Sequence, residues 1–124
     1  MKLFLSYYQR DESLDEIVKE LEDRGFTVRT NFERLNGEDV EWKTDHRLKR
    51  IRSCDAFIFF AEPEGTPRSL IRQIELGYAL GSERAIAYVG QPQNSLHRWG
   101  DTFDDIDDFL DQWHFDRSRE TAVA

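Results

Sequence analysis

Two patterns of apolar residues alternate along the chain. Short apolar runs are typical of β-strands, and apolar residues that recur every three or four positions are typical of amphipathic helices. The apolar runs predict four strands, over residues 2–6, 26–30, 55–60 and 84–89. The helical spacing predicts four helices, over about residues 11–24, 40–54, 69–80 and 103–113. A brief fifth strand is predicted near Thr102, after a short helix near Ser95.

The strand over residues 55–60 is apolar throughout, as in the centre of a parallel sheet, and the strand over 26–30 alternates, as at a sheet edge. Right-handed crossovers between parallel strands then predict a three-layer, flavodoxin-like α/β fold with strand order 2-1-3-4 and helices on both faces. A fifth strand would extend the edge. In this order the chain reverses direction between the first and third strands. The reversal opens a crevice above their carboxyl ends, where open α/β sheets bind ligands.

The length of 124 residues fits one domain, expected over residues 1–116 with a frayed tail over 117–124. The net charge of −8 argues against nucleic acid as a partner, because phosphate binding needs a basic surface. No apolar run approaches the ~20 residues of a membrane span, and the first residues do not resemble a signal peptide. We therefore expect no membrane partner and a cytoplasmic location. One cysteine and three scattered histidines predict no disulfide and no metal site.

Glu75 is the first candidate for chemistry. It lies near the start of a predicted helix that follows the central strand and the polar loop over residues 61–68. This position places it at the carboxyl edge of the sheet. It is bracketed by Ile74 and Leu76 and followed by Gly77 and Gly81, which predicts a segment packed closely against its neighbours. A ligand site is therefore favoured over a purely structural role for Glu75.

The segment around Glu75 resembles a known family. The stretch Glu75–Leu80, together with residues 51–58 and 86–90, is similar to the nucleoside 2-deoxyribosyltransferase family and its nucleotide N-hydrolase relatives. The resemblance implies that Glu75 attacks or stabilises the anomeric carbon of a riboside. It also implies that the loop after the first strand contacts the base and the sugar. Tyr7, Ser6 and Arg68 are the candidate hydrogen-bond donors to Glu75.

The N-terminal half resembles a TIR domain. The similar residues are Phe4–Tyr7, Arg10 with Asp11, residues 35–38, Trp42, and Ser69 six positions before the glutamate. This resemblance implies that Ser6, Arg10 and Ser69 line a site for a nicotinamide dinucleotide. NAD would then be a substrate, and no other cofactor is implied. Together the two resemblances cover about residues 1–90, and both imply a flavodoxin-like fold.

Two positions depart from the transferase pattern. The family has an aspartate eight residues before the position of Asp55, where this chain has Arg47. It has a second aspartate six residues before the glutamate, where this chain has Ser69. Asp45 is the nearest carboxylate to the first position, but two residues along a helix rotate a side chain by about 200°. Asp45 can therefore replace the missing aspartate only in a different helix register.

Two functions stay open from the sequence. The first is an enzyme that cleaves or transfers an N-glycosidic bond of a nucleoside or nucleotide, with Glu75 at its centre. The second is a TIR-like module that senses a nucleotide or assembles with itself without turnover, or a TIR-type NAD hydrolase. The partner is a small molecule in each case. The resemblance also implies a homo-oligomer.

Overall fold

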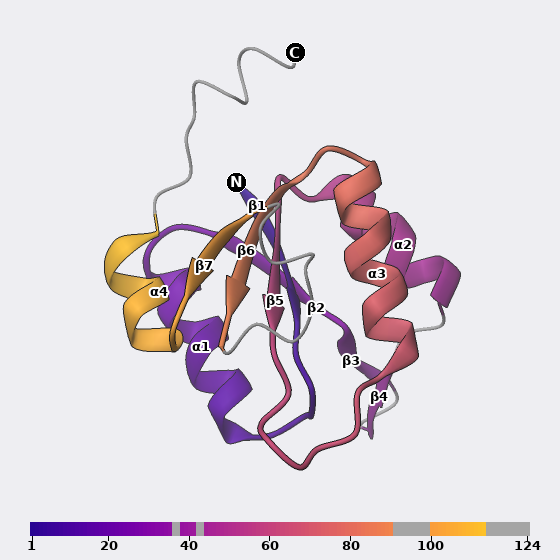
Figure 1. The fold of residues 1–124 in the computed structure, drawn as a ribbon, viewed down its shortest axis with the longest axis horizontal. Coiled ribbons are helices and arrows are strands. Elements are labelled where there is room, and N and C mark those ends of the chain that lie inside the picture. The colour runs from indigo at the N-terminus through magenta and orange to yellow at the C-terminus, as the bar shows by residue number, and fades with distance from the viewer. Residues whose placement is uncertain (36–37, 42–43, 91–99, 114–124) are drawn as a thin grey trace.

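Five parallel strands form the central sheet, in the order β2-β1-β5-β6-β7. The computed structural model describes residues 1–35, 38–41, 44–90 and 100–113 (Figure 1). The strands of the sheet are β1 (Lys2–Ser6), β2 (Thr27–Thr30), β5 (Ala56–Phe60), β6 (Ala85–Val89) and β7 (Asp101–Phe103). The predicted flavodoxin-like order is confirmed, and the fifth strand lies at the edge beside β6.

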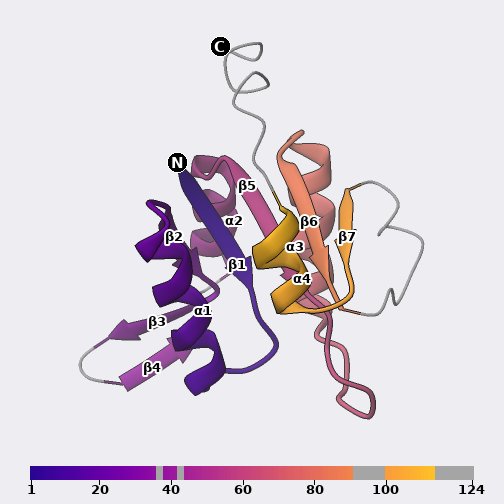
Figure 2. The same ribbon diagram turned by 90° about the vertical axis from the view of Figure 1, so that its left-hand side faces the viewer.

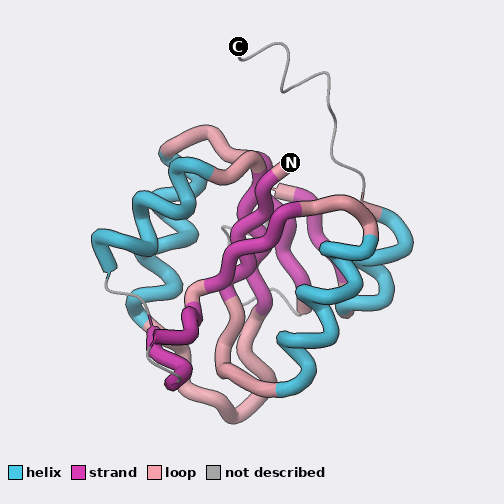
Figure 3. Tube along the Cα trace, turned by 180° about the vertical axis from the view of Figure 1, so that it is seen from behind, coloured by secondary structure: helices cyan, strands magenta, loops and turns pink. Residues whose placement is uncertain are grey.

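Helices cover both faces of the sheet, as Figures 1 and 3 show. The helices are α1 (Glu12–Asp23), α2 (Thr44–Ser53), α3 (Leu70–Gly81) and α4 (Ile106–Gln112). α1 and α4 cover one face, and α2 and α3 cover the other. The structure therefore has the three layers that the sequence predicts.

The alternation of side chains along the strands builds two separate cores. In β1, Leu3 and Leu5 join the core under α1 and α4, whereas Phe4 joins the core under α2 and α3. The central strand β5 divides in the same way, and all five of its side chains are buried. Full burial of each such side chain stabilises the fold by about 1.5–3 kcal/mol. The apolar run over 55–60 thus reflects a strand that is covered on both faces.

Local capping sets the ends of α1. The side chain of Asp11 accepts a hydrogen bond from the backbone N–H of Leu14 at 3.1 Å, which satisfies one of the free donors of the first turn. At the other end Gly25 has a φ of 96°, and the next N–H donates back to the carbonyl of Leu21 at 3.1 Å. Glycine adopts this left-handed conformation without steric cost. Gly25 therefore ends the helix, as the sequence predicts.

A β-hairpin replaces the first turn of the second predicted helix. Its strands are β3 (Phe32–Leu35) and β4 (Glu38–Glu41), which pair antiparallel. Figure 2 shows the hairpin lying apart from the central sheet. The prediction of a helix from residue 40 was wrong, because α2 begins at Thr44. The Asn36–Gly37 dipeptide between two short segments is a sequence signal for such a hairpin.

The C-terminal elements differ slightly from the prediction. Phe103 ends β7, and the helix begins three residues later with Asp105 as its N-cap. Phe109 is the buried anchor of α4, and its ring stacks on that of Trp113 with centroids 5.2 Å apart. The short helix near Ser95 and the tail over 117–124 lie outside the described residues. Within the described parts of the chain, no helix has the length and apolar character needed to cross a bilayer.

Candidate functional site

Glu75 forms an ion pair with Arg47 in the layer of α2 and α3. The Nη2 atom of Arg47 donates to Oε1 of Glu75, and neither residue exposes any surface (0%). The inner face of α3 explains the burial, because Arg72, Glu75, Leu76 and Ala79 follow the i, i+3, i+4, i+7 spacing of one helix face. Two ionisable residues therefore lie on the apolar face of this helix.

Arg72 forms a second buried ion pair, with Glu62 in the loop after β5. Its Nε donates to the Ser6 hydroxyl at 3.1 Å and its Nη2 to the Ser6 carbonyl at 2.9 Å. The same Nη2 also donates to the carbonyl of Phe60. Because Ser6 ends β1 and Phe60 ends β5, the guanidinium lies where the sheet order reverses. Arg72 thus occupies the crevice in which open α/β sheets bind ligands.

The electrostatic state of Arg72 follows from its burial. Burial lowers the pKa of Arg72, and the nearby carboxylates of Glu62 and Glu75 act in the opposite direction. An arginine keeps its proton at neutral pH even after such a shift. The guanidinium carbon also lies 4.3 Å from the centre of the Phe59 ring, where the ring face attracts a cation. Arg72 is therefore a charged group that several partners hold in place.

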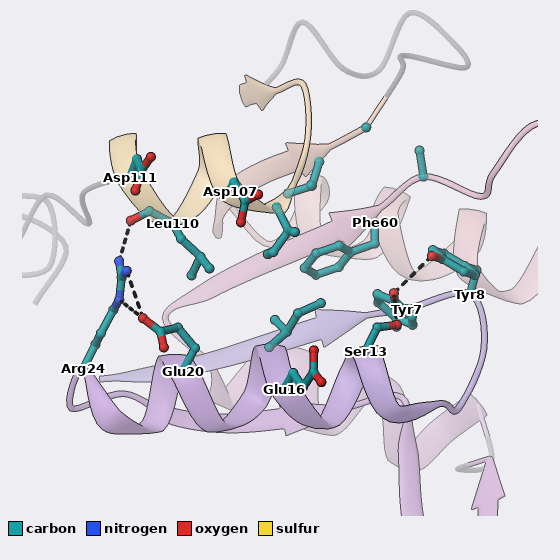
Figure 4. Close-up of a pocket in the computed structure, with 15 residues that line it drawn as sticks. Tyr7, Tyr8, Ser13, Glu16, Glu20, Arg24, Phe60, Asp107, Leu110 and Asp111 are labelled. Atoms are coloured by element: carbon teal, nitrogen blue, oxygen red, sulfur yellow. Dashed lines mark hydrogen bonds and ion pairs between the residues drawn. The ribbon is translucent and has the colours of Figure 1, made fainter.

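A pocket of about 550 Å³ lies on the opposite face of the sheet, between α1 and α4. Tyr7, Phe60 and Gly90 line it at the carboxyl ends of three strands, and Glu75 is not among its lining residues. Ser6 is the last residue of β1 and Tyr7 directly follows it, and the contacts of their side chains lie on opposite faces of the sheet. Ser6 contacts Arg72 in the layer of α2 and α3. Tyr7 lines the pocket between α1 and α4, as Figure 4 shows.

The remaining candidate residues lie around this edge with different environments. Arg10 pairs with Asp15 at 2.8 Å and donates to the carbonyl of Asp11 at 3.0 Å. Arg68 is exposed in the loop before α3. Ser69 is the N-cap of α3, and its hydroxyl accepts from the N–H of Arg72 at 3.4 Å. The backbone of Asp45 belongs to the first turn of α2, and its side chain lies outside the described structure.

The predicted close packing of the segment around Glu75 is confirmed, but it does not involve Gly77 and Gly81. A Cβ atom added at Gly77 or Gly81 would meet no described atom within 4 Å, beyond the backbone of the helix itself. These glycines therefore do not allow a close approach by the described neighbours of the helix. Close packing is instead found on the face that carries Glu75 and Leu76.

Sequence reasoning missed the two arginine partners of the site. Arg72 has the i, i+3 spacing to Glu75 that places both on one helix face, and this spacing is a signal in the sequence. Arg47 departs from a family pattern in the sequence, but no local pattern indicates that it pairs with Glu75. Among the described residues, no three histidine, cysteine, aspartate or glutamate side chains lie close enough to hold a metal ion.

Comparison with known proteins shows a likeness in structure. No protein-family model matches the sequence, and no curated protein matches it. A CMP N-glycosidase from Clostridium botulinum matches with a TM-score of 0.62 and 21% identity, over 90% of this chain and 97% of that protein. A 2-deoxyribosyltransferase from Bacillus psychrosaccharolyticus matches with a TM-score of 0.66 and 20% identity, over 93% of each chain.

A conserved protein from Enterococcus faecalis V583 also matches, with a TM-score of 0.63 and 9% identity, over 90% of this chain and 95% of that one. The likeness thus extends over nearly the whole length of these structures at low identity. The predicted resemblance to the nucleoside 2-deoxyribosyltransferases is confirmed in fold, and the resemblance to TIR domains stays a prediction. The chain has the α/β fold that a nucleotide N-glycosidase and a 2-deoxyribosyltransferase share.

Proposed function

We propose that this protein binds a nucleoside or nucleotide and cleaves or transfers its N-glycosidic bond, with Glu75 as nucleophile or electrostatic stabiliser. Breaking that bond develops positive charge on the sugar ring. A carboxylate ~3 Å from the anomeric carbon can stabilise this charge or capture the carbon covalently. The shared fold with a CMP N-glycosidase and a 2-deoxyribosyltransferase supports this class of reaction.

The observation that carries the proposal is the environment of the Glu75 carboxylate. It is completely buried on the inner face of α3, and it has a guanidinium partner in Arg47. A buried carboxylate without a cationic partner favours its neutral form, which cannot stabilise a developing cation. The ion pair supports a carboxylate that is ionised at neutral pH, as the proposed role requires.

The same ion pair sets a condition on the reaction. Arg47 occupies Oε1 of Glu75, and the pair exposes no surface. A sugar can reach the carboxylate only after the side chains that cover it have moved. The positive charge of the sugar in the transition state would then take the place of the guanidinium. We therefore infer that this ion pair opens before catalysis.

A second candidate function follows from the same contact. If Arg47 stays on Glu75 when ligand is bound, the protein is a nucleotide-binding module without turnover, of the TIR-like kind. The positive charge of Arg47 at the position of a family aspartate favours this alternative. Self-assembly of such a module, and a homo-oligomer in general, remain predictions from resemblance.

The two functions are separated by a search for free base. The purified chain is incubated with nucleosides, deoxynucleosides, nucleotides including CMP, and NAD, and the products are separated by chromatography. Release of a base that Glu75→Gln abolishes supports the enzyme. If no compound releases base, but one raises the melting temperature, the binding module is supported. A ligand at ~100 times its Kd adds about 2.7 kcal/mol of stability, which is easily detected.

A control addresses the stability of the variants. Glu75→Gln leaves the Arg47 charge buried without its carboxylate, so part of any loss could come from unfolding. The comparison therefore includes Glu64→Gln, an exposed glutamate in the loop between β5 and α3. Circular dichroism at the assay temperature shows whether each variant is folded. If no compound releases base and none shifts the melting temperature, both functions are contradicted.

A further inference from the structure

The pocket between α1 and α4 is a second candidate ligand site, separate from Glu75. It has a volume of about 550 Å³, which is in the range of sites that hold small molecules. Its apolar lining includes Ile17, Phe60 and Val89. Figure 4 shows Glu16 on the wall formed by α1 and Asp107 on the wall formed by α4.

The hydroxyl groups at one end of the pocket form a hydrogen-bonded chain. The Ser13 hydroxyl donates to Oδ1 of Asp11 at 2.6 Å. The Tyr7 hydroxyl lies 2.9 Å from the Ser13 oxygen, and the Tyr8 hydroxyl lies 3.0 Å from the Tyr7 oxygen. Tyr7 is 4% exposed and lines the pocket together with Tyr8 and Ser13.

Asp11 fixes the direction of every bond in this chain. An ionised carboxylate can only accept, so the Ser13 proton is committed to Asp11. The hydrogen bond from Ser13 lowers the pKa of Asp11 and keeps it ionised. Tyr7 must then donate to Ser13, and Tyr8 must donate to Tyr7. All three hydroxyl protons are used, so these groups present only lone pairs to a ligand.

The charged residues of the pocket also favour a ligand that donates hydrogen bonds. Four carboxylates line it: Glu16, Glu20, Asp107 and Asp111. Arg24 is the one cation among the described lining residues, and it is already bound to Glu20 at 3.1 Å and to the carbonyl of Leu110. The hydroxyls and the carboxylates therefore both select hydrogen-bond donors, and the carboxylates repel anions.

We propose that this pocket binds an organic amine with an aromatic or apolar body. The ammonium group would lie among Glu16, Asp107 and the Tyr8 oxygen, and the body would cover Phe60 and Ile17. A phosphate-bearing ligand does not suit this pocket, because its four carboxylates repel an anion and Arg24 is held by Glu20 and the carbonyl of Leu110. The pocket is thus separate from the buried ion pairs around Glu75, and the proposal does not depend on the proposed function.

Three compounds with the same phenol ring test the charge preference by calorimetry on the whole chain. Tyramine carries an ammonium group, 4-ethylphenol is neutral, and 3-(4-hydroxyphenyl)propionate carries a carboxylate. We expect saturable binding of tyramine, binding of 4-ethylphenol at least tenfold weaker, and no saturable binding of the propionate. The proposal is overturned if the propionate binds as tightly as tyramine. It is also overturned if tyramine shows no saturation up to ~10 mM, which corresponds to a free energy of binding weaker than about −2.7 kcal/mol.

Paired variants locate the site. Glu16→Gln/Asp107→Asn removes the two facing carboxylates, and we expect at least a tenfold weaker binding of tyramine. Glu22→Gln/Asp101→Asn removes the same charge from exposed positions outside the pocket lining, and we expect a Kd within twofold of the wild type. If both pairs weaken binding equally, the amine is attracted by the net charge of the protein alone and the pocket is not its site.

Discussion

Arg47 and Glu75, 28 residues apart in sequence, form an ion pair that is closed to solvent between two helices. Replacement of Arg47 by methionine would leave a buried carboxylate without its partner. We expect Arg47→Met to lower the free energy of unfolding by about 3–5 kcal/mol. The double variant Arg47→Met/Glu75→Leu should be more stable than the single variant, since an apolar pair of similar volume avoids the desolvation of both charges.

Urea denaturation of the single and double variants measures this coupling. Lys49→Met, at an exposed position of α2, is the matched control and should change the free energy of unfolding by less than ~0.5 kcal/mol. A cost for Arg47→Met as small as that of the control would show that the ion pair does not form in solution.

The contribution of Arg72 to stability should depend on the shape of its side chain as well as on its charge. Its guanidinium contacts Ser6, Phe60 and Glu62 at once. We expect Arg72→Met to cost about 3–5 kcal/mol, because Glu62 loses its buried partner. Arg72→Lys should recover only part of this loss, because an ammonium group cannot reproduce the planar arrangement of donors.

Chemical denaturation compares these two variants with Arg68→Met, an exposed arginine of the preceding loop. Full stability in Arg72→Lys would mean that charge alone is sufficient. In that case the hydrogen bonds from Arg72 to the ends of β1 and β5 would not contribute to stability.

Two glycines should respond to alanine with opposite signs. A Cβ at Gly100 would lie 2.6 Å from the carbonyl oxygen of Ile86, so Gly100→Ala requires a shift of backbone and should cost about 1–3 kcal/mol. Gly77 is an exposed helical position with no described neighbour within 4 Å of the added atom, so Gly77→Ala should add up to ~1 kcal/mol. If the melting temperatures of the two variants shift in the same direction, the packing described around Gly77 and Gly100 is contradicted.

The N-cap of α1 should make the stability of the protein depend on pH. Hydrogen bonds, that from Ser13 foremost, hold the pKa of Asp11 below its ordinary value of 3.8. The charged form therefore stabilises the folded state above that value, and the benefit is lost as the pH falls through the lower pKa of the folded protein. Asp11→Asn keeps a cap but not the charge, so it should be less stable than wild type at pH 7, by under ~1 kcal/mol.

Denaturation of Asp11→Asn and wild type between pH 7 and pH 2 provides the measurement. The difference in free energy of unfolding should shrink only below the ordinary pKa of 3.8. A constant difference across the whole range would show that the charge of Asp11 is not responsible.

The central sheet was predictable because its signals are local. Strand β5 is apolar at every position since it is covered on both faces, and the helices carry apolar residues at helical spacing. The hairpin was missed because residues 38–41 hold one apolar residue among three acidic ones, which resembles neither pattern. Its clearest signal in the sequence is the Asn36–Gly37 dipeptide and not the segments on either side of it.

The site was harder to predict because its partners come from distant segments. Glu75 could be selected from its place after a central strand. The burial of Arg72 depends on Ser6, 66 residues earlier, and on Phe60. A charged residue on a helix is usually solvated, so no local pattern distinguishes Arg72 or Arg47 from a surface arginine. Only the packing of α2 and α3 against the sheet reveals their role.

The loss of base release on removal of the Glu75 carboxylate tests the proposed function most directly. The substrate is the compound that the wild type cleaves fastest in the nucleoside and nucleotide panel, and the initial rate of free base formation is measured by chromatography. Glu75→Gln and Arg47→Met/Glu75→Leu should both lose at least ~100-fold in rate, as expected for loss of a group that stabilises transition-state charge. Glu64→Gln should keep the wild-type rate. A rate in folded Glu75→Gln within threefold of that of Glu64→Gln, or no base release by the wild type from any compound, would contradict the role of Glu75.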